Sequence, residues 1–354
     1  NEFEKIENYL KIGNWKLKIP TQKKNISDQE NINYLSINPK RTNKHQAFVP
    51  IMTGCNNFCS YCVVPYARGR EASRTADEIL KEIKGLIKNN YKEIILLGQN
   101  VNSYHGALKE SKLPTGQAYN IKHRTKIINF SELLEKINAI SGNFWISFIS
   151  NHPKDFSDEL IKTATKLKKV CEYIHLPVQA GDNKILKKMN RKYTQEQYLK
   201  IIDKIKKSFR KNKSKKLYSI TSDIIVGFPG ETKKQFSESA KIMEKVGYDM
   251  VYFGQFSPRP ETHALQMKDN VSKKEKSRRE EYLNEILKKT SFENNQKYLN
   301  KTLEVLIDSE RNGFYFGRTR TMKNVKIISK NKNLVGKIVK IKITKANIWN
   351  LEGK

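Results

Sequence analysis

The stretch Cys55-Asn56-Asn57-Phe58-Cys59-Ser60-Tyr61-Cys62 places three thiols at spacings of four and three residues in one short loop. A chain that turns sharply can bring these side chains to a single centre. Zinc normally takes four protein ligands in a closed structural site, whereas thiolates also hold iron–sulfur clusters, and three of them can carry a cubane with one iron left open. Because no fourth ligand is adjacent, Cys55, Cys59 and Cys62 predict a [4Fe-4S] cluster. The alternative is a zinc knuckle, or incidental cysteines in a reduced protein.

The residues on either side of this loop have the pattern of a strand and a helix. The apolar run 47–52 is typical of a buried strand, and Gly54 leaves the backbone free to turn. Downstream, the Ser, Thr and acidic residues within 73–79 are typical of a helix start. Strand, metal-binding loop and helix together form the first unit of an α/β barrel.

The same alternation continues through the middle of the chain. Further strands are predicted at 93–98, 144–149, 173–178, 218–226 and 250–255, with helices at 79–88, 130–140, 156–169, 194–210 and 232–246. Six strands separated by helices indicate an α/β fold, an open (β/α)6 barrel rather than the eight units of a closed one. Residues 107–128 are polar and are predicted to be a surface insertion.

The two ends of the chain differ from this core, which we place at 45–290. A charged helix is predicted at 272–298, followed by strands with period-two alternation at 303–308, 314–319, 325–328 and 336–343. Residues 291–354 therefore predict a small antiparallel β-barrel of the oligonucleotide-binding type. Residues 1–44 show no convincing long period, and we interpret them as the trailing remnant of a preceding domain plus a linker.

The charge of the chain indicates a polyanionic partner. The sequence has 68 Lys and Arg against 36 Asp and Glu, a net charge of +32, which favours phosphate contacts and hence nucleic acid. A compositional bias toward Lys, Asn and Ile is the competing explanation. Four cysteines, no secretory pattern and no run of about 18 apolar residues lead us to expect a cytoplasmic protein without a membrane span.

Polar or Gly-rich residues follow the predicted strands, at the edge where barrel enzymes carry their chemistry. A turn or capping role is the alternative at each of these positions. The candidates are Gln99 and Asn100 after the second strand, Ser150-Asn151-His152-Pro153 after the third, Gln179 after the fourth, and Gly227 and Glu231 after the fifth. In the predicted small barrel, Arg318, Arg320, Lys323 and Lys326 are candidate phosphate contacts, and Tyr315 or Phe316 could stack on a base unless they are core residues.

The cysteine loop resembles that of the radical S-adenosylmethionine (SAM) enzymes, whose pattern is Cys-x3-Cys-x2-Cys with an aromatic residue, here Tyr61, before the last cysteine. From about Ala47 to the C-terminus, the chain resembles the tRNA methylthiotransferase family. The motifs that carry this likeness are 61–69 (YCVVPYARG), 97–102 (LGQNVN), 175–181 (HLPVQAG) and 225–232 (IVGFPGET). The tail resembles the RNA-binding TRAM domain of these enzymes.

The resemblance implies a cofactor set and an activity. A [4Fe-4S] cluster on the three cysteines would bind SAM, contacted by Tyr61 and the strand-end residues, and reductive cleavage would yield a radical that abstracts hydrogen from the substrate. Gln99-Asn100-Val101 favours the branch that methylthiolates C2 of N6-(dimethylallyl)adenosine at position 37 in the anticodon loop of tRNA. Alternatives are threonylcarbamoyladenosine or a ribosomal protein as substrate, or a metal-stabilised RNA-binding protein without turnover.

The resemblance also implies partners and one absence. We expect an electron donor such as flavodoxin or ferredoxin, and a monomer. Family members carry a second, auxiliary [4Fe-4S] cluster on three further cysteines of an N-terminal domain. Outside the radical loop only Cys171 remains here, and we expect it to be a buried, inert thiol. The chain as given is therefore expected to bind one cluster and cleave SAM, yet to form no methylthio product.

Overall fold

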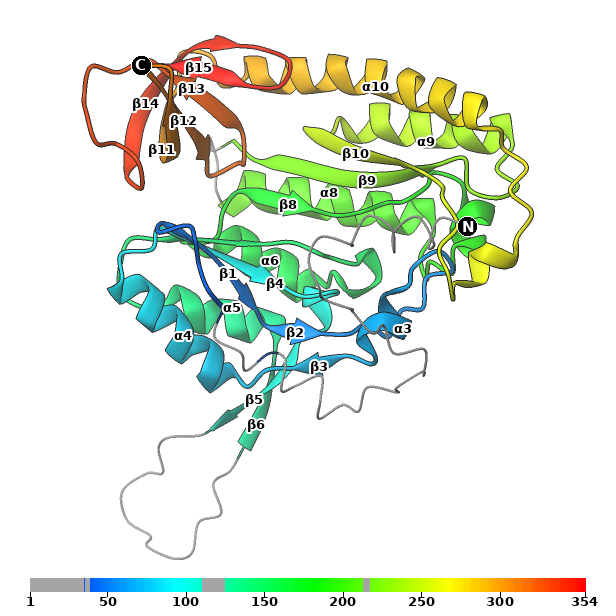
Figure 1. Ribbon diagram of the computed structural model, residues 1–354, viewed down its shortest axis with the longest axis horizontal. Helices are drawn as coiled ribbons and strands as arrows, with labels where there is room; N and C mark the ends of the chain where they lie inside the picture. Colours follow the sequence, from blue (N-terminus) through cyan, green and yellow to red (C-terminus); the bar gives the residue numbers. More distant parts are fainter. Residues whose placement is uncertain (1–34, 36–38, 110–124, 213–216) are drawn as a thin grey trace, which may run out of the picture.

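The computed structural model describes residue 35 and residues 39–109, 125–212 and 217–354. Two bodies are visible, a core of parallel strands flanked by helices and a small barrel at one end (Figure 1). Most of the predicted remnant at 1–44 and the centre of the predicted insertion lie outside the described residues. In the described ranges, no helix is both long and apolar enough to cross a membrane.

Six parallel strands form the core. One sheet has the order β1 (Gln46–Pro50), β4 (Glu93–Leu97), β7 (Trp145–Phe148), and a second has the order β8 (Tyr173–His175), β9 (Ser219–Val226), β10 (Met250–Gln255). An isolated parallel bridge pairs Ile146 of β7 with Val170, which precedes β8 in the chain. Among the described residues, β1 and β10 each pair with a neighbouring strand on one side only. They are the two free edges of the core, so the predicted open six-stranded barrel is confirmed.

Helices alternate with these strands as predicted. They are α4 (Ala76–Lys88), α5 (Phe130–Asn138), α6 (Asp158–Lys166), α8 (Gln195–Asn212) and α9 (Lys233–Val246), with short helices α3 (Val64–Arg68) and α7 (Asn183–Lys188) and single turns η1 (Val101–Ser103), η2 (Pro153–Asp155) and η3 (His263–Gln266). Local chemistry sets their starts, since Asn129 and Thr232 each form a capping box with the residue three positions on. Helix α6 is shorter than predicted because Leu167 is extended.

The predicted surface insertion begins and ends in a two-stranded ribbon. Strands β5 (His105–Lys109) and β6 (Thr125–Asn129) pair in antiparallel fashion. A second small ribbon pairs β2 (Met52–Thr53) with β3 (Ala72–Ser73), and sequence analysis missed it because each strand has only two residues. This second ribbon brackets the cysteine loop and brings its two ends together.

Five strands close the small C-terminal barrel. They are β11 (Thr302–Arg311), β12 (Phe314–Thr319), β13 (Asn324–Ile327), β14 (Ile338–Ala346) and β15 (Leu351–Gly353), in the order β11-β12-β13-β15-β14. The barrel was predicted, but β15 was not, since three residues carry no readable alternation. Its pairing with β13 is parallel, and every other pair in the barrel is antiparallel. The long helix α10 (Lys273–Gln296) runs along α9 and connects core and barrel (Figure 1).

The barrel packs against the amino ends of the core strands. The apolar contact consists of Trp145, Cys171 and Leu306, all of them buried. Because parallel strands begin at the same edge of a sheet and end at the other, the carboxyl ends are left free. In Figure 1 the barrel and α3, which follows the cysteine loop, lie at opposite ends of the molecule.

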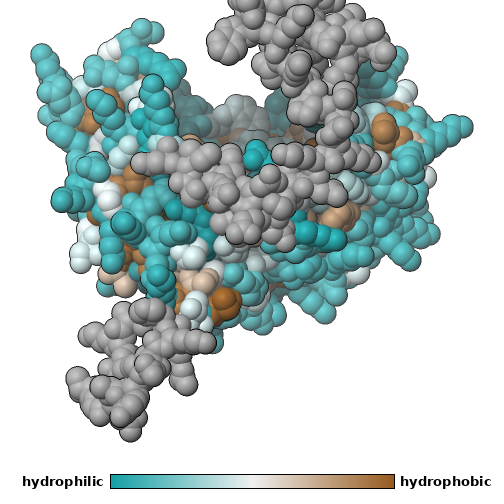
Figure 2. Space-filling view, turned by 60° about the horizontal axis from the view of Figure 1, so that its bottom comes forward, coloured by the Kyte–Doolittle hydropathy of each residue, from teal (hydrophilic) through white to brown (hydrophobic). Residues whose placement is uncertain are grey.

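The surface is predominantly polar. Figure 2 shows one face on which hydrophilic residues dominate and hydrophobic ones are scattered singly. This agrees with a sequence in which 29% of residues are charged. Large apolar side chains exposed by more than half are few among the described residues: Phe48, Ile127, Tyr252, Tyr282 and Ile328.

Candidate active site

The cysteine loop leaves the core immediately after β1 and β2. The backbone N–H of Cys55 donates to the carbonyl of Gly69 at 3.2 Å, and that of Cys62 donates to the carbonyl of Cys59 at 2.9 Å. Gly54 has a φ of +74°, and a Cβ there would lie 2.0 Å from the carbonyl oxygen of Arg70. Only glycine can occupy this position, because both the left-handed backbone and the close approach exclude a side chain.

Three consecutive residues from the turn after α7 hold this loop. Met189 accepts a hydrogen bond from the backbone N–H of Ser60 at 3.0 Å, and the Asn190 amide donates to the carbonyl of Phe58 at 2.8 Å. Arg191 donates from its guanidinium to Sγ of Cys59 at 3.3 Å. We call residues 189–191 the loop brace. Sequence analysis did not identify it, because no local pattern marks contacts made across more than 120 residues of chain.

A cavity of about 330 Å³ lies between the cysteine loop and the carboxyl ends of the neighbouring strands. Its lining comes from the cysteine loop, from the ends of β4, β7 and β8, and from the loop brace. The lining residues are Cys55, Asn57, Cys59, Tyr61, Cys62, Val64, Gly98, Gln99, Ser150, Asn151, His152, Pro177, Gln179 and Arg191. The fold thus brings the thiols and three strand ends around one space.

Several polar atoms in the wall of this cavity have no partner within the described chain. They are Oε1 of Gln99, Oδ1 of Asn151 and Nε2 of His152. A buried polar group without a hydrogen bond is costly, so these atoms are available to bind a ligand. One donor and two acceptors, on residues that line a cavity beside three thiols, fit a zwitterionic, hydrogen-bonding cofactor such as SAM.

His152 faces this cavity as a neutral side chain. Its Nδ1 accepts a hydrogen bond from the backbone N–H of Lys154 at 3.2 Å, which leaves Nε2 to carry the ring proton. Burial, reinforced by the charges of Arg191 and Lys154, lowers the pKa of His152 to about 2. His152 is therefore a hydrogen-bond donor and not a cation at neutral pH.

The thiols suit a cluster better than a single ion. Burial raises the pKa of Cys55 and of Cys62, so both are protonated without metal and must release protons on binding it. Among the described residues, no three Cys, His, Asp or Glu side chains converge on a point where they could share one metal ion. A cubane takes one thiolate on each of three irons, and the three cysteines that line the cavity can supply them.

The predicted SAM-binding residues divide into two groups. Tyr61, Gln99 and Gln179 line the cavity with the thiols. Asn100 does not, because its amide donates to Asp155 at 2.8 Å and holds the η2 turn. Gly227 and Glu231 are also outside the lining: the Gly227 N–H donates to the Glu231 carboxylate at 2.9 Å, which in turn pairs with buried Arg279 at 2.8 Å.

The predicted RNA contacts divide in a similar way. Arg318 pairs with Glu93 at 3.2 Å, Arg320 with Glu172 at 2.8 Å and Lys323 with Asp249 at 2.7 Å. All three carboxylates lie at the amino ends of core strands, so these cations hold the barrel onto the core instead of facing solvent. Lys326 points elsewhere and rests on the ring of Phe314, 3.8 Å from its centroid. Tyr315 packs in the core of the small barrel, which is the alternative to base stacking that the sequence left open.

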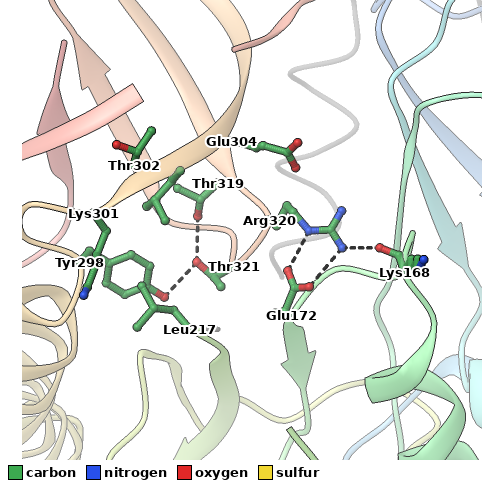
Figure 3. Close-up of a pocket in the computed structure, with 11 residues that line it drawn as sticks. Lys168, Glu172, Leu217, Tyr298, Lys301, Thr302, Glu304, Thr319, Arg320 and Thr321 are labelled. Atoms are coloured by element: carbon green, nitrogen blue, oxygen red, sulfur yellow. Dashed lines mark hydrogen bonds and ion pairs between the residues drawn. The ribbon is translucent and has the colours of Figure 1, made fainter. Parts of the chain in front are cut away.

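A larger cavity, of about 520 Å³, lies in this same interface (Figure 3). In the figure Arg320 bonds Glu172 and the carbonyl of Lys168 on one side, and Tyr298 and Thr321 form a hydroxyl chain on the other. Among the residues that the structure describes, no thiol and no unpartnered buried atom contributes to its lining. The smaller cavity beside the cysteine loop is therefore the candidate active site.

Comparison with known proteins identifies two families in the chain. The radical SAM superfamily matches residues 49–243, and the TRAM domain matches residues 296–354. A tRNA-2-methylthio-N(6)-dimethylallyladenosine synthase from Thermoanaerobacter sp. (strain X514) is 46% identical over 318 residues, covering 89% of this chain and 63% of its own length. One of the same name from Finegoldia magna is 41% identical over 352 residues, covering 99% and 70%.

The fold, the cysteine loop and these matches define a radical SAM protein with a C-terminal TRAM domain. The chain belongs to the radical SAM superfamily and, within it, to the family of the tRNA-2-methylthio-N(6)-dimethylallyladenosine synthases. It spans 63% of the length of the Thermoanaerobacter relative. Among solved structures it is similar to the radical SAM methyltransferase TsrM from Kitasatospora setae, with 15% identity, a TM-score of 0.47 and coverage of 62% of this chain and 38% of that one.

Proposed function

We propose that this chain carries the radical-generating and RNA-binding parts of an enzyme that methylthiolates C2 of N6-(dimethylallyl)adenosine at position 37 of tRNA. The observation that carries the proposal is the cavity that brings Cys55, Cys59 and Cys62 together with three unpartnered polar atoms at the carboxyl ends of the barrel strands. Bound there, a [4Fe-4S] cluster supplies the electron that cleaves SAM and so generates the radical needed at an unactivated C–H bond.

The chain's own residues would hold and orient these groups. The three thiolates bind the cluster. Nε2–H of His152 would donate to an acceptor on SAM, and the oxygens of Gln99 and Asn151 would accept from amino or hydroxyl groups of SAM. Tyr61, which lies between the second and third cysteines in the sequence and lines the same cavity, would contact the bound cofactor.

The open side of the barrel offers an entry for the substrate base. Phe48 on β1 and Tyr252 on β10 are 51% and 58% exposed, whereas their neighbours Val49 and Val251 are buried in the core. The two exposed rings therefore lie on the two edge strands of the open barrel. Exposed rings suit stacking on a base that has been splayed out of a single-stranded anticodon loop.

The net charge of +32 supports a tRNA anticodon stem-loop as the partner. Within the barrel we assign Lys326 to phosphate contact, since Arg318, Arg320 and Lys323 have carboxylate partners. We further propose a flavodoxin or ferredoxin as electron donor, a monomeric state and a cytoplasmic location.

Anaerobic reconstitution tests this proposal. The chain should bind iron and sulfide, turn brown and convert SAM to methionine and 5′-deoxyadenosine when reduced. Binding should be tighter to tRNA that carries dimethylallyladenosine than to tRNA that carries threonylcarbamoyladenosine, and it should weaken as salt rises. A colourless zinc protein that binds tRNA would support the non-enzymatic alternative, and preference for a ribosomal protein would overturn the substrate assignment.

Nucleoside analysis in cells addresses the product itself. In tRNA from cells that lack the gene, mass spectrometry should find dimethylallyladenosine without its methylthio group. Loss of the methylthio group from threonylcarbamoyladenosine instead would assign the enzyme to the other branch of the family.

A further inference from the structure

Arg191 is a buried cation whose charge has no carboxylate partner among the described residues. It is 8% exposed, and the protein partners of its guanidinium are the hydroxyl of Tyr193 at 2.9 Å, the carbonyl of Pro177 at 3.4 Å and Sγ of Cys59 at 3.3 Å. Every other buried arginine or lysine of the described chain, namely Lys276, Arg279 and Lys323, pairs with an Asp or Glu. Arg191 is the exception.

An unpaired buried guanidinium is expensive, because it loses water without gaining a counter-charge. Arginine does not escape this cost by losing its proton. The neutral contacts to Tyr193 and Pro177 satisfy its N–H groups but not its charge. Cys59 is the only cysteine-loop residue among these contacts, so a negatively charged group held by the three cysteines would lie beside this charge and compensate it.

The charge of a three-thiolate cluster matches this requirement. A [4Fe-4S]2+ core with three thiolates carries net negative charge, and one-electron reduction makes it more negative still. A fixed positive charge stabilises the reduced form more than the oxidised form, and a hydrogen bond to a ligand sulfur acts in the same direction. The guanidinium of Arg191 supplies both the fixed charge and the hydrogen bond, and both act on the Cys59 ligand.

The anchoring of Arg191 makes it a fixed charge and not a mobile one. Tyr193 is buried, donates its own proton to the carbonyl of Val178 at 2.9 Å and packs edge-on against His152. Its oxygen is thereby held in position to accept from Nε of Arg191. These contacts keep the guanidinium beside Cys59 and away from solvent. The positive charge therefore stays in the same place when the cluster is reduced.

We infer that Arg191 is a positioning residue that holds a positive charge against the Cys59 ligand and thereby raises the reduction potential of the cluster. The inference rests on the cluster proposed above. It assigns the third residue of the loop brace an electrostatic task, while Met189 and Asn190 shape the loop through backbone contacts.

A redox titration of the reconstituted full chain tests this inference. Arg191→Gln keeps a hydrogen-bond donor and removes the charge, so its reduced-to-oxidised ratio at a fixed potential should fall at least about tenfold, equivalent to a shift of about 59 mV to lower potential for a one-electron couple. Electron paramagnetic resonance measures the reduced fraction directly. The matched control is Lys192→Gln, which removes an exposed charge from the adjacent residue and should leave the potential unchanged.

A conservative variant separates charge from shape. Arg191→Lys retains the charge and should keep the potential near that of the unmodified chain, even if its iron content drops. If Arg191→Gln and Lys192→Gln have equal potentials at full iron content, or if Arg191→Lys shifts as far as Arg191→Gln, the inference is overturned and Arg191 only shapes the loop. If the unmodified chain binds no cluster, the proposed function fails instead.

Discussion

At the scale of single residues, the three cysteines of the loop should act as one unit. Changing any of Cys55, Cys59 or Cys62 to Ala leaves two thiolates, which hold a cubane poorly, so bound iron and SAM cleavage should both be lost. Iron quantitation and product chromatography measure the two effects. Cys171→Ala is the matched control, and this variant should keep its full iron content. Cys171 is buried against Trp145 and Leu306, where the small barrel packs against the amino ends of the core strands. A loop variant that retained iron and activity would refute the assignment.

His152 should give the chain a measurable pH dependence of stability. Its pKa is about 2 when folded and about 6.5 in an unfolded chain, so the unfolded state binds more protons between these values and stability falls as the pH drops below about 6.5. Between about pH 6.5 and 5.5 the loss is about 1 kcal/mol. His152→Asn should remove this part of the slope in urea unfolding.

An exposed histidine provides the control for this measurement. His263 is solvent-exposed, and His263→Asn should leave the slope between these two pH values as it is in the unmodified chain. If His152→Asn also leaves it unchanged, His152 is not buried as a neutral ring.

At the scale of elements, the turn between β12 and β13 should be essential for docking the small barrel. Arg320 donates to both carboxylate oxygens of buried Glu172 and to the carbonyls of Lys168 and Val170. Removing one partner of a buried ion pair leaves the other charge uncompensated. Arg320→Ala should therefore lower the free energy of unfolding by about 3 kcal/mol, as measured by urea denaturation.

A cation on the same barrel with a different environment is the control for Arg320. Lys326→Ala removes a side chain that rests on the ring of Phe314, so it should cost under about 1 kcal/mol while weakening tRNA binding at low salt. Equal destabilisation by the two changes would show that the interface pair does not hold the barrel.

Because of this interface, deleting the C-terminal barrel is a poor test of its role in tRNA binding. Deleting residues after about Thr290 would uncover Trp145 and leave Glu93, Glu172 and Asp249 without their cations. We expect such a deletion to destabilise the core, so loss of tRNA binding in it would not isolate the role of the barrel. Single substitutions on the outer face of the barrel avoid this difficulty.

At the scale of the whole molecule, the cysteine count limits the metal content. Four cysteines are present; three surround the candidate active site, and Cys171 lies in the interface with the barrel. We predict about four irons per chain, cleavage of SAM and no methylthiolated tRNA from this chain alone. Iron and sulfide quantitation and nucleoside mass spectrometry measure these outcomes. About eight irons, or methylthiolated product, would mean that sulfur insertion needs no further cysteines.

Much of the architecture followed from local sequence. The spacing of the three cysteines places them in one loop, the alternation of apolar runs with helical periods predicts six parallel strands, and period-two alternation predicts the small barrel. These properties depend on neighbours within a few residues, which is why their element types agree with the structure. The short strands β2, β3 and β15 were missed because two or three residues show no period, whereas β8, equally short, lies within the longer apolar run 173–178 that was predicted.

The partners of charged side chains were decided only by the tertiary structure. Arg318, Arg320 and Lys323 looked like phosphate contacts because they cluster on a basic barrel, yet long-range packing sets each against a carboxylate at the start of a core strand. Arg191 gave no signal at all, since its contact with Cys59 spans 132 positions of the chain. A charge can pair with any opposite charge that the fold brings near, so its role cannot be read from its own neighbourhood in the sequence.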